Sequence, residues 1–190
     1  IYEERIEDTK NAGATGFYPG GTYTYFKSFE AKNEWKDKSW LLEFEGVYEH
    51  AMVYLNGALV CTNKNGYTNF YADLTRYLHW NEENELKVVA DNSSEENSRW
   101  YSGSGIYRNV NLYIGNMISI PVEGVKITTQ NADEEVAVLG IRTKVRNESN
   151  SQEKLEIITT FCDDEGNVYA EQSYLSAFAH TEYEMYQSIS

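Results

Sequence analysis

The chain has 190 residues, a formal net charge of −14 and 41% hydrophobic residues. This length is enough for one large domain or two ordinary ones, and the composition excludes a disordered chain. The apolar runs are too short to cross a bilayer, and the acidic charge repels phosphate backbones, so neither a membrane nor nucleic acid is expected as a partner.

Short strands dominate the first half of the predicted structure. Tyr, Trp, Val, Thr and Phe favour pleated, half-buried surfaces, and the chain carries 16 Tyr and four Trp. The apolar runs predict strands at Thr22–Phe29, Trp40–Phe44, Ala51–Leu55, Ala58–Val60, Leu86–Ala90 and Val110–Ile114. The Asn56-Gly57 pair between two of these runs predicts a tight hairpin, because both turn positions need a positive φ.

The sequence pattern changes at Pro121, and apolar and polar residues alternate more regularly after it. Further strands are expected at Val136–Val145, Leu155–Phe161, Val168–Tyr174 and Glu182–Tyr186, with a turn at Asp163–Asn167. Strands of this length at near-regular spacing predict an antiparallel sandwich. We place a domain boundary within residues 115–121.

Few residues form a pattern that points to chemistry. His50, His79 and His180 are scattered, and packing roles are favoured over catalysis for each. The cluster Asp163-Asp164-Glu165 does not have the spacing of an EF-hand, so a solvated turn is preferred to a calcium loop. Cys61 and Cys162 lack a nearby partner at metal-ligand spacing. No metal site and no cofactor are therefore predicted.

One segment, Ser98–Arg108, combines aromatic residues, glycines and two arginines. Aromatic faces with neighbouring hydrogen-bonding groups suit sugar rings. Composition alone favours the plainer interpretation, a glycine-hinged corner whose aromatic side chains are buried between sheets.

This segment, with Arg-Trp-Tyr-Ser-Gly-Ser-Gly-Ile-Tyr-Arg at Arg99–Arg108, resembles the signature near the end of the first domain of glycoside hydrolase family 2. Other segments resemble that family in the same order: Phe17–Gly21 with Tyr25–Phe29, Phe44–Val47 with Val53–Gly57, Gly66–Phe70 with Asp73–Thr75, and Asn84–Asn92. Ile141–Asn147 with Gly166–Val168 is similar to its second domain. The resemblance implies a galactose-binding-like jelly-roll sandwich at 1–117 and an immunoglobulin-like sandwich at 118–190.

Enzymes of this family hydrolyse β-linked glycosides with retention, using two glutamates on a (β/α)₈ barrel that follows these domains. Asn33-Glu34 and Asn147-Glu148 are interpreted as sandwich turns, so no catalytic residue is carried over. In the β-galactosidase branch the loop before the signature contributes to the active-site rim, which implies a rim role for Asn97, Arg99, Trp100 and Tyr101. Arg99 would donate hydrogen bonds to a sugar or a barrel carboxylate, or else fix the loop through a salt bridge.

The resemblance implies the non-catalytic front of a retaining hydrolase, with β-galactosidase as the leading activity. Its partners would be the β-glycoside and the C-terminal catalytic barrel of the same chain, and a homo-oligomer is left open. The alternative is a free-standing carbohydrate-binding module with an exposed aromatic platform, and a third reading is a protein-interaction sandwich. No signal peptide is visible at Ile1–Arg5, which favours the cytoplasm weakly.

Overall fold

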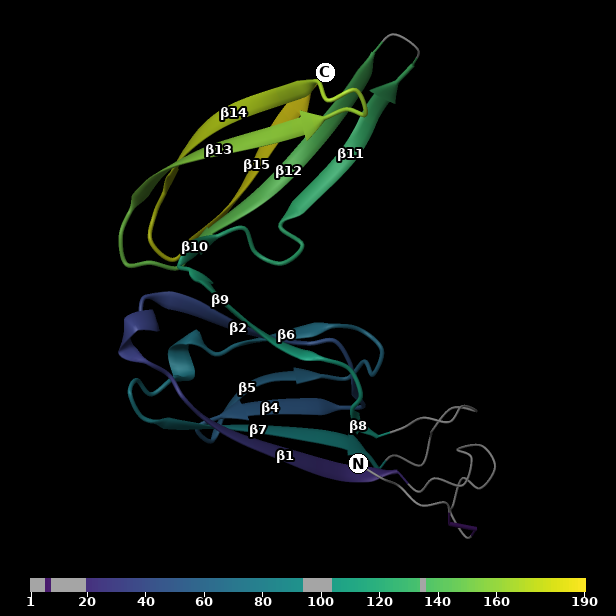
Figure 1. Ribbon diagram of the computed structural model, residues 1–190, viewed down its shortest axis with the longest axis vertical. Coiled ribbons are helices and arrows are strands. Elements are labelled where there is room, and N and C mark those ends of the chain that lie inside the picture. Colours follow the sequence, from purple (N-terminus) through teal and green to yellow (C-terminus); the bar gives the residue numbers. More distant parts are fainter. Residues whose placement is uncertain (1–5, 8–19, 94–103, 134–135) are drawn as a thin grey trace. The chain divides into compact units, whose positions relative to one another are not determined.

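The computed structural model describes residues 6–7, 20–93, 104–133 and 136–190 (Figure 1). The chain divides into two compact units, Ile1–Ile114 and Gly115–Ser190. Strands make up both units, and the described residues contain no α-helix, only two short 3₁₀ turns, η2 (Asn33–Trp35) and η3 (Thr75–Tyr77). The predicted all-β sandwich class is confirmed.

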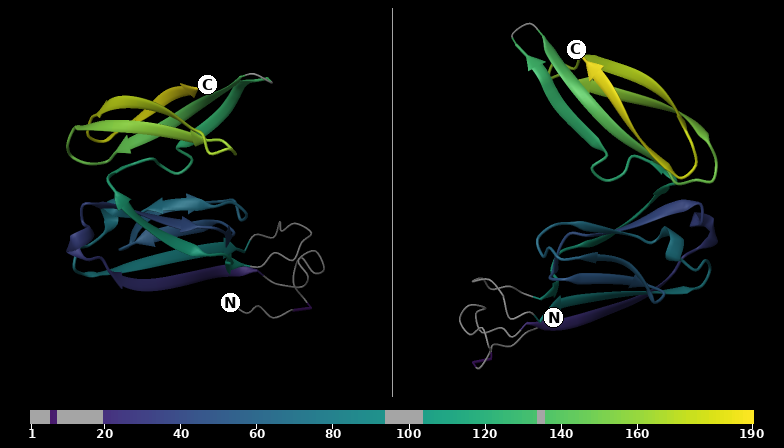
Figure 2. Two further views of the ribbon diagram at one scale, coloured as in Figure 1. Left: turned by 45° about the horizontal axis from the view of Figure 1, so that its top comes forward. Right: turned by 180° about the vertical axis from the view of Figure 1, so that it is seen from behind.

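Two sheets form the first unit (Figures 1 and 2). One has the strand order β1-β7-β4-β5, and the other has the order β6-β2-β9. A two-stranded pair, β3-β8, forms a separate small sheet. The strands are β1 (Gly21–Glu30), β2 (Lys38–Phe44), β3 (Val47–Tyr48), β4 (Ala51–Leu55), β5 (Ala58–Asn63), β6 (Phe70–Asp73), β7 (Glu83–Asn92), β8 (Gly105–Ile106) and β9 (Val110–Asn116).

The hairpin of β4 and β5 forms where the Asn-Gly pair predicts it. Asn56 and Gly57 have φ values of 51° and 81°, so both adopt the left-handed conformation that the tight turn needs. The Asn56 side chain also donates to the Asn84 side chain and to the Tyr77 carbonyl, each at 2.8 Å. The turn is therefore fixed by local conformation and by contacts to a distant part of the chain.

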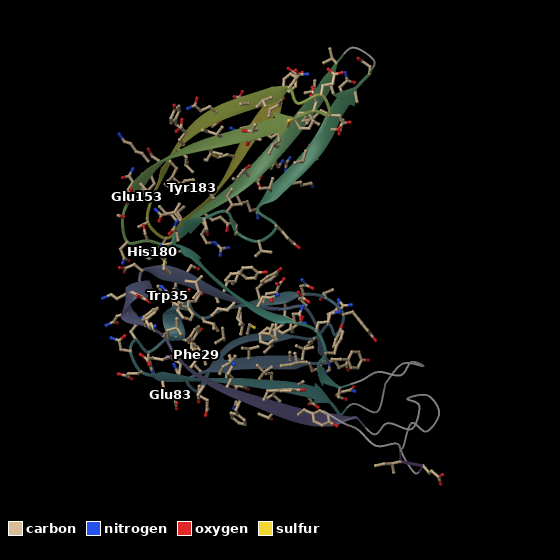
Figure 3. The ribbon with its side chains drawn as sticks, in the orientation of Figure 1. Phe29, Trp35, Glu83, Glu153, His180 and Tyr183 are labelled. Atoms are coloured by element: carbon tan, nitrogen blue, oxygen red, sulfur yellow. The ribbon has the colours of Figure 1, made fainter. Side chains whose placement is uncertain are left out.

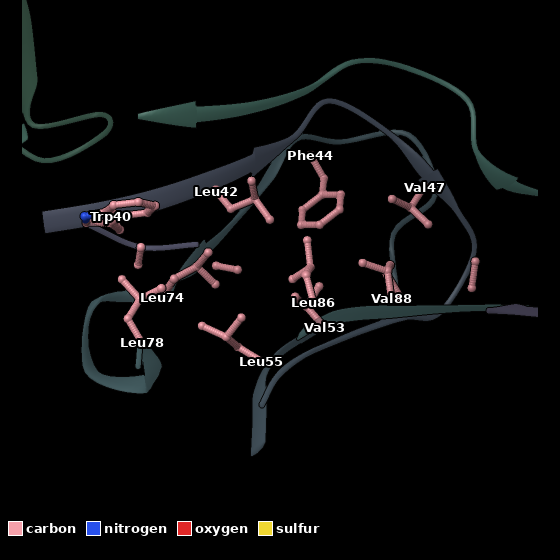
Figure 4. Packing of buried hydrophobic residues seen from close by; sticks show 14 residues of the cluster. Trp40, Leu42, Phe44, Val47, Val53, Leu55, Leu74, Leu78, Leu86 and Val88 are labelled. Atoms are coloured by element: carbon pink, nitrogen blue, oxygen red, sulfur yellow. The ribbon is translucent and has the colours of Figure 1, made fainter. Parts of the chain in front are cut away.

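The hydrophobic core of the first unit lies between its two sheets (Figure 4). Alternate residues of β4 and β7 are buried, which gives each strand one face toward the core. The Phe44 and Phe70 rings stack at 4.8 Å between centroids. The buried members include Trp40, Leu42, Phe44, Val47, Val53, Leu55, Leu74, Leu86 and Val88.

Tryptophans close one end of this sandwich. The Trp40 ring lies 5.7 Å from Trp35 and 6.0 Å from Trp80, and it stacks on Phe29 at 6.2 Å. Figure 3 shows Phe29 and Trp35 at the end of the unit opposite to β8. These rings consequently serve packing, and the family segment at Ser104–Arg108 lies at the other end.

The second unit has a four-strand sheet centred on β12 (Ala137–Asn147) and a two-strand sheet. β11 (Val125–Ala132) and the short β10 (Ile118–Ser119) pair with one edge of β12, and β15 (Thr181–Ile189) pairs with the other edge. β13 (Glu153–Cys162) pairs with β14 (Val168–Ala177). The predicted turn at Asp163–Asn167 joins this pair, and the Asp163 carboxylate accepts hydrogen bonds from Glu165 and Asn167.

Polar side chains hold the ends and the middle of the second unit. The buried Asn147 side chain donates to the carbonyls of Ser151 and Ala177 at 2.9 and 3.0 Å. The buried Gln187 of β15 accepts from Thr159 of β13 and donates to Ser173 of β14. Because Gln187 and its two partners lie on different sheets, this side chain links the two layers.

Candidate functional site

The candidate site is built around the described part of the family signature, Ser104–Arg108. β8 pairs with β3 in antiparallel register, and the Ile106 amide donates to the Tyr25 hydroxyl at 3.2 Å. The Asn92 side chain at the end of β7 donates to the Ser104 hydroxyl at 2.9 Å. Ser104 and Ile106, which follow the segment 94–103 in the chain, are therefore held by contacts with β1, β3 and β7.

The four predicted rim residues Asn97, Arg99, Trp100 and Tyr101 lie in this segment and outside the described residues. Their assignment to the rim stays a prediction.

A tyrosine patch, formed by Tyr48, Tyr67 and Tyr107, lies beside β3 and β8. The Tyr48 and Tyr67 rings meet edge to face at 5.4 Å, and the Tyr107 hydroxyl donates to the Gly66 carbonyl at 2.7 Å. Tyr67 and Tyr107 are 61% and 45% exposed. Because a tyrosine ring offers an apolar face and a polar tip, this patch has the chemistry that binds sugars.

Two glycines allow these rings to pack closely. A Cβ on Gly66 would lie 2.3 Å from the Tyr48 ring, and a Cβ on Gly46 would lie 2.6 Å from the Tyr107 ring. Any larger residue would push the ring away. The Arg108 guanidinium lies 5.4 Å from the Tyr107 ring centroid, within the range of a cation–π contact.

A second cluster, the Glu43 network, escaped the sequence analysis. The Glu43 carboxylate on β2 accepts four side-chain hydrogen bonds, two at each oxygen. Asn69 and Tyr71 donate to Oε1 at 2.9 Å, and Asn111 and Tyr113 donate to Oε2 at 3.1 and 2.9 Å. Since Trp40, Leu42 and Phe44 face the core, the alternation of the strand places Glu43 on the outer face of the β6-β2-β9 sheet.

These donors explain how an acidic residue lies buried on a sheet surface. The hydrogen bonds from Asn111, then from Tyr71 and Tyr113, lower the pKa of Glu43, although burial acts in the opposite direction. The hydrogen bond to Glu43 also raises the pKa of the Tyr113 hydroxyl. The network therefore stabilises an ionised carboxylate, which is the opposite of the raised pKa that a general acid needs.

Other chemical features are few within the described ranges. No group of three or more His, Cys, Asp or Glu residues is placed there to hold a metal ion. Among the same residues, no helix has the length and apolar character needed to cross a bilayer. The site is therefore described by its tyrosines, its glycines and the Glu43 network.

Comparison with known proteins identifies the family. A family model described as the glycosyl hydrolase 2 galactose-binding domain-like family matches residues 4–118. The chain is 41% identical to a β-galactosidase of Bacteroides ovatus over 156 residues, which are 82% of this chain and 18% of that protein. It is 29% identical to a β-glucuronidase of Formosa agariphila over 170 residues, covering 79% of this chain and 17% of that protein.

Solved structures of family 2 enzymes also match this chain. A glycosyl hydrolase family 2 member from Bacteroides cellulosilyticus matches with a TM-score of 0.85 and 27% identity, over 100% of this chain and 24% of that one. A β-glucuronidase of Bacteroides uniformis matches with a TM-score of 0.81 and 26% identity, over 90% of this chain and 22% of that one. The chain spans about a fifth of the length of the curated relatives it matches. Because the family model covers more than half of the sequence, the chain belongs to glycoside hydrolase family 2 through its galactose-binding-like domain.

Proposed function

We propose that this chain is the non-catalytic front region of a retaining β-glycosidase of family 2, with β-galactosidase as the leading activity. The match of the galactose-binding-like family model to residues 4–118 carries the proposal. The 41% identity to a β-galactosidase, against 29% to a β-glucuronidase, supports the choice of galactoside. The same proposal takes residues 1–117 as a jelly-roll domain and 118–190 as an immunoglobulin-like domain.

In this proposal the chain supports a catalytic barrel and lends residues to the rim of its active site. The segment 94–103, with Asn97, Arg99, Trp100 and Tyr101, would supply the rim. The tyrosine patch and the hydrogen bond from Asn92 to Ser104 hold the described residues beside this segment. The sugar is expected to be bound jointly with the barrel, since an interface of two domains is a common place for a ligand site.

Enzyme assays test the proposal directly. The protein made from the complete gene is expected to hydrolyse p-nitrophenyl β-galactoside faster than the β-glucuronide, with retention of anomeric configuration. The 190-residue chain by itself is expected to hydrolyse neither. Turnover by the isolated chain would refute the non-catalytic role. If the complete protein preferred the glucuronide, the proposed substrate would be a β-glucuronide and not a β-galactoside.

The exposed rings of Tyr67 and Tyr107 favour one second candidate, a free-standing carbohydrate-binding module. Titration of the isolated chain with galactose and β-galactosides separates the two functions. A module would bind sugar alone and lose that binding in Tyr67→Ala. A rim-forming domain would show no saturable heat of sugar binding unless the catalytic barrel is present.

A further inference from the structure

Two Asn-Gly pairs occur in the sequence, Asn56-Gly57 and Asn65-Gly66, and the fold places them in different surroundings. Asparagine is chemically labile, and a following glycine, which has no Cβ, lets its main-chain nitrogen approach the asparagine side chain. The structure needs both glycines, because Gly57 has a φ of 81° and a Cβ on Gly66 would lie 2.3 Å from the Tyr48 ring. The surroundings of each pair therefore decide how fast its asparagine reacts.

The Asn56 side chain is held by three hydrogen bonds. Its Nδ2 donates to the Tyr77 carbonyl and to the Asn84 side chain, each at 2.8 Å, and its Oδ1 accepts from the Glu85 amide at 3.0 Å. These partners lie 21, 28 and 29 residues away in the sequence, on η3 and β7. Because this amide is committed to distant partners, it can react with the Gly57 nitrogen only after these bonds are released.

The Asn65 side chain is held by one hydrogen bond, and this bond is local. Asn65 is exposed, and its Oδ1 accepts from the Tyr67 amide, two residues on, at 2.9 Å. Among the described residues, its Nδ2 has no acceptor. A hydrogen bond to the carbonyl oxygen makes Cγ more electrophilic and stabilises the negative charge that develops on this oxygen during nucleophilic attack. The turn at Asn65 thus favours the reaction that the contacts of Asn56 oppose.

We infer that Asn65 is a site of spontaneous deamidation in the folded protein, whereas Asn56 is protected. The Gly66 nitrogen loses its proton to hydroxide and forms a bond to Cγ of Asn65. The bond from Cγ to the side-chain nitrogen breaks, and ammonia leaves after taking a proton from water, which regenerates the hydroxide. Water then opens the cyclic imide. Opening at Cγ gives aspartate, and opening at the main-chain carbonyl gives isoaspartate, with no oxidant or reductant involved.

Both products would change the tyrosine patch. Each adds a negative charge at position 65, two residues before Tyr67. Isoaspartate also lengthens the main chain by a methylene just before Gly66, whose carbonyl accepts from the Tyr107 hydroxyl at 2.7 Å and which lies against the Tyr48 ring. The inference therefore assigns an age-dependent modification to the candidate site, and it holds whether or not the chain is part of an active hydrolase.

Peptide mapping by mass spectrometry gives the first test, with Asn56 as the internal control. The 190-residue chain is incubated at mildly alkaline pH, either folded or in guanidinium, and conversion is followed by the mass gained when oxygen replaces NH. In guanidinium the two pairs should react at similar rates. In the folded chain Asn65 should react faster than Asn56 by about tenfold or more, because three hydrogen bonds hold Asn56 in place.

Two results of this experiment would overturn the inference. One is a folded chain in which Asn65 stays intact while it converts in guanidinium. The other is a ratio of the Asn65 and Asn56 rates that is the same in the folded chain as in guanidinium, since the fold would then have no part in the selection.

Asn65→Gln gives the matched variant, because the longer side chain closes the imide ring much more slowly. Conversion at position 65 should disappear, and conversion at Asn56 should not change. Near-ultraviolet circular dichroism then reports on the tyrosines. Aged wild-type protein should differ from fresh protein, whereas aged Asn65→Gln should match its fresh sample. An equal change in both proteins would overturn the assignment of the altered patch to Asn65.

Discussion

Some side chains of the first unit form hydrogen bonds with residues that are far away in the sequence, so local sequence does not reveal these contacts. Glu43 follows Leu42 and precedes Phe44, so its outward direction could be predicted from alternation. Its burial could not, because its four donors lie 26, 28, 68 and 70 residues away in the sequence. A carboxylate that receives four donors resembles a structural anchor more than a catalytic group.

The ionised form of Glu43 should stabilise the fold. The folded-state pKa is lower than the ordinary value of 4.5, so its stabilising effect is present above that pH and is lost as the pH falls through the folded-state pKa. Glu43→Gln should lower the melting temperature near neutral pH, because the amide turns a donor toward other donors. The difference from wild type should shrink in acid. Glu30→Gln, at an exposed position of β1, serves as the control in thermal melts, and a difference that persists in acid would contradict the assignment.

Gly66 should be intolerant of a methyl group. Gly66→Ala places a Cβ 2.3 Å from the Tyr48 ring, and overpacking of this kind costs about 1–3 kcal/mol of stability. Gly115→Ala meets no atom within 4 Å and should change stability by less than about 0.5 kcal/mol. Urea denaturation measures both, and equal values for the two variants would show that the tyrosine patch is loosely packed.

At the level of strands, the sequence predicts those elements whose pattern is local. The long runs became β1, β2, β4, β7, β9, β12, β13, β14 and β15, with ends shifted by a few residues. The two-residue strands β3, β8 and β10 were not predicted, because they exist only through a partner distant in the chain. The rim residues could be named only from the family resemblance, since nothing local distinguishes a rim loop from any other polar loop.

Gln187 should be the key contact between the two sheets of the second unit. Gln187→Ala leaves the side chains of Thr159 and Ser173 without this partner and should cost about 1–3 kcal/mol. The neighbouring Ser188 is exposed, so Ser188→Ala should be close to neutral. Guanidinium unfolding followed by circular dichroism compares them, and a neutral Gln187→Ala would mean that the sheets are held by apolar contacts alone.

The two units of the chain differ in the size of their hydrophobic cores. Among the residues that the structure describes, the first unit buries a cluster of 14 apolar residues, whereas the second contributes Ile141, Val145, Ala177 and Ile189. Because buried apolar area is the main favourable term in folding, the second unit should be the less stable of the two in isolation.

Calorimetry of the 190-residue chain should therefore show two transitions. Gln187→Ala should move only the lower one and Gly66→Ala only the upper one, which assigns each transition to its unit. A single transition that both substitutions shift would show that the two units unfold as one cooperative body.

The hydrogen bond between Asn92 and Ser104 joins two residues that flank the segment 94–103 in the chain. A loop with fixed ends can change in length or sequence at little entropic cost, because closure depends only weakly on loop length. Loops on a rigid scaffold are also where ligand contacts tend to change. In the proposed function, where residues 94–103 supply the rim, new sugar preferences would be introduced in evolution or in engineering by exchanging this one segment while the described sandwich remains the same.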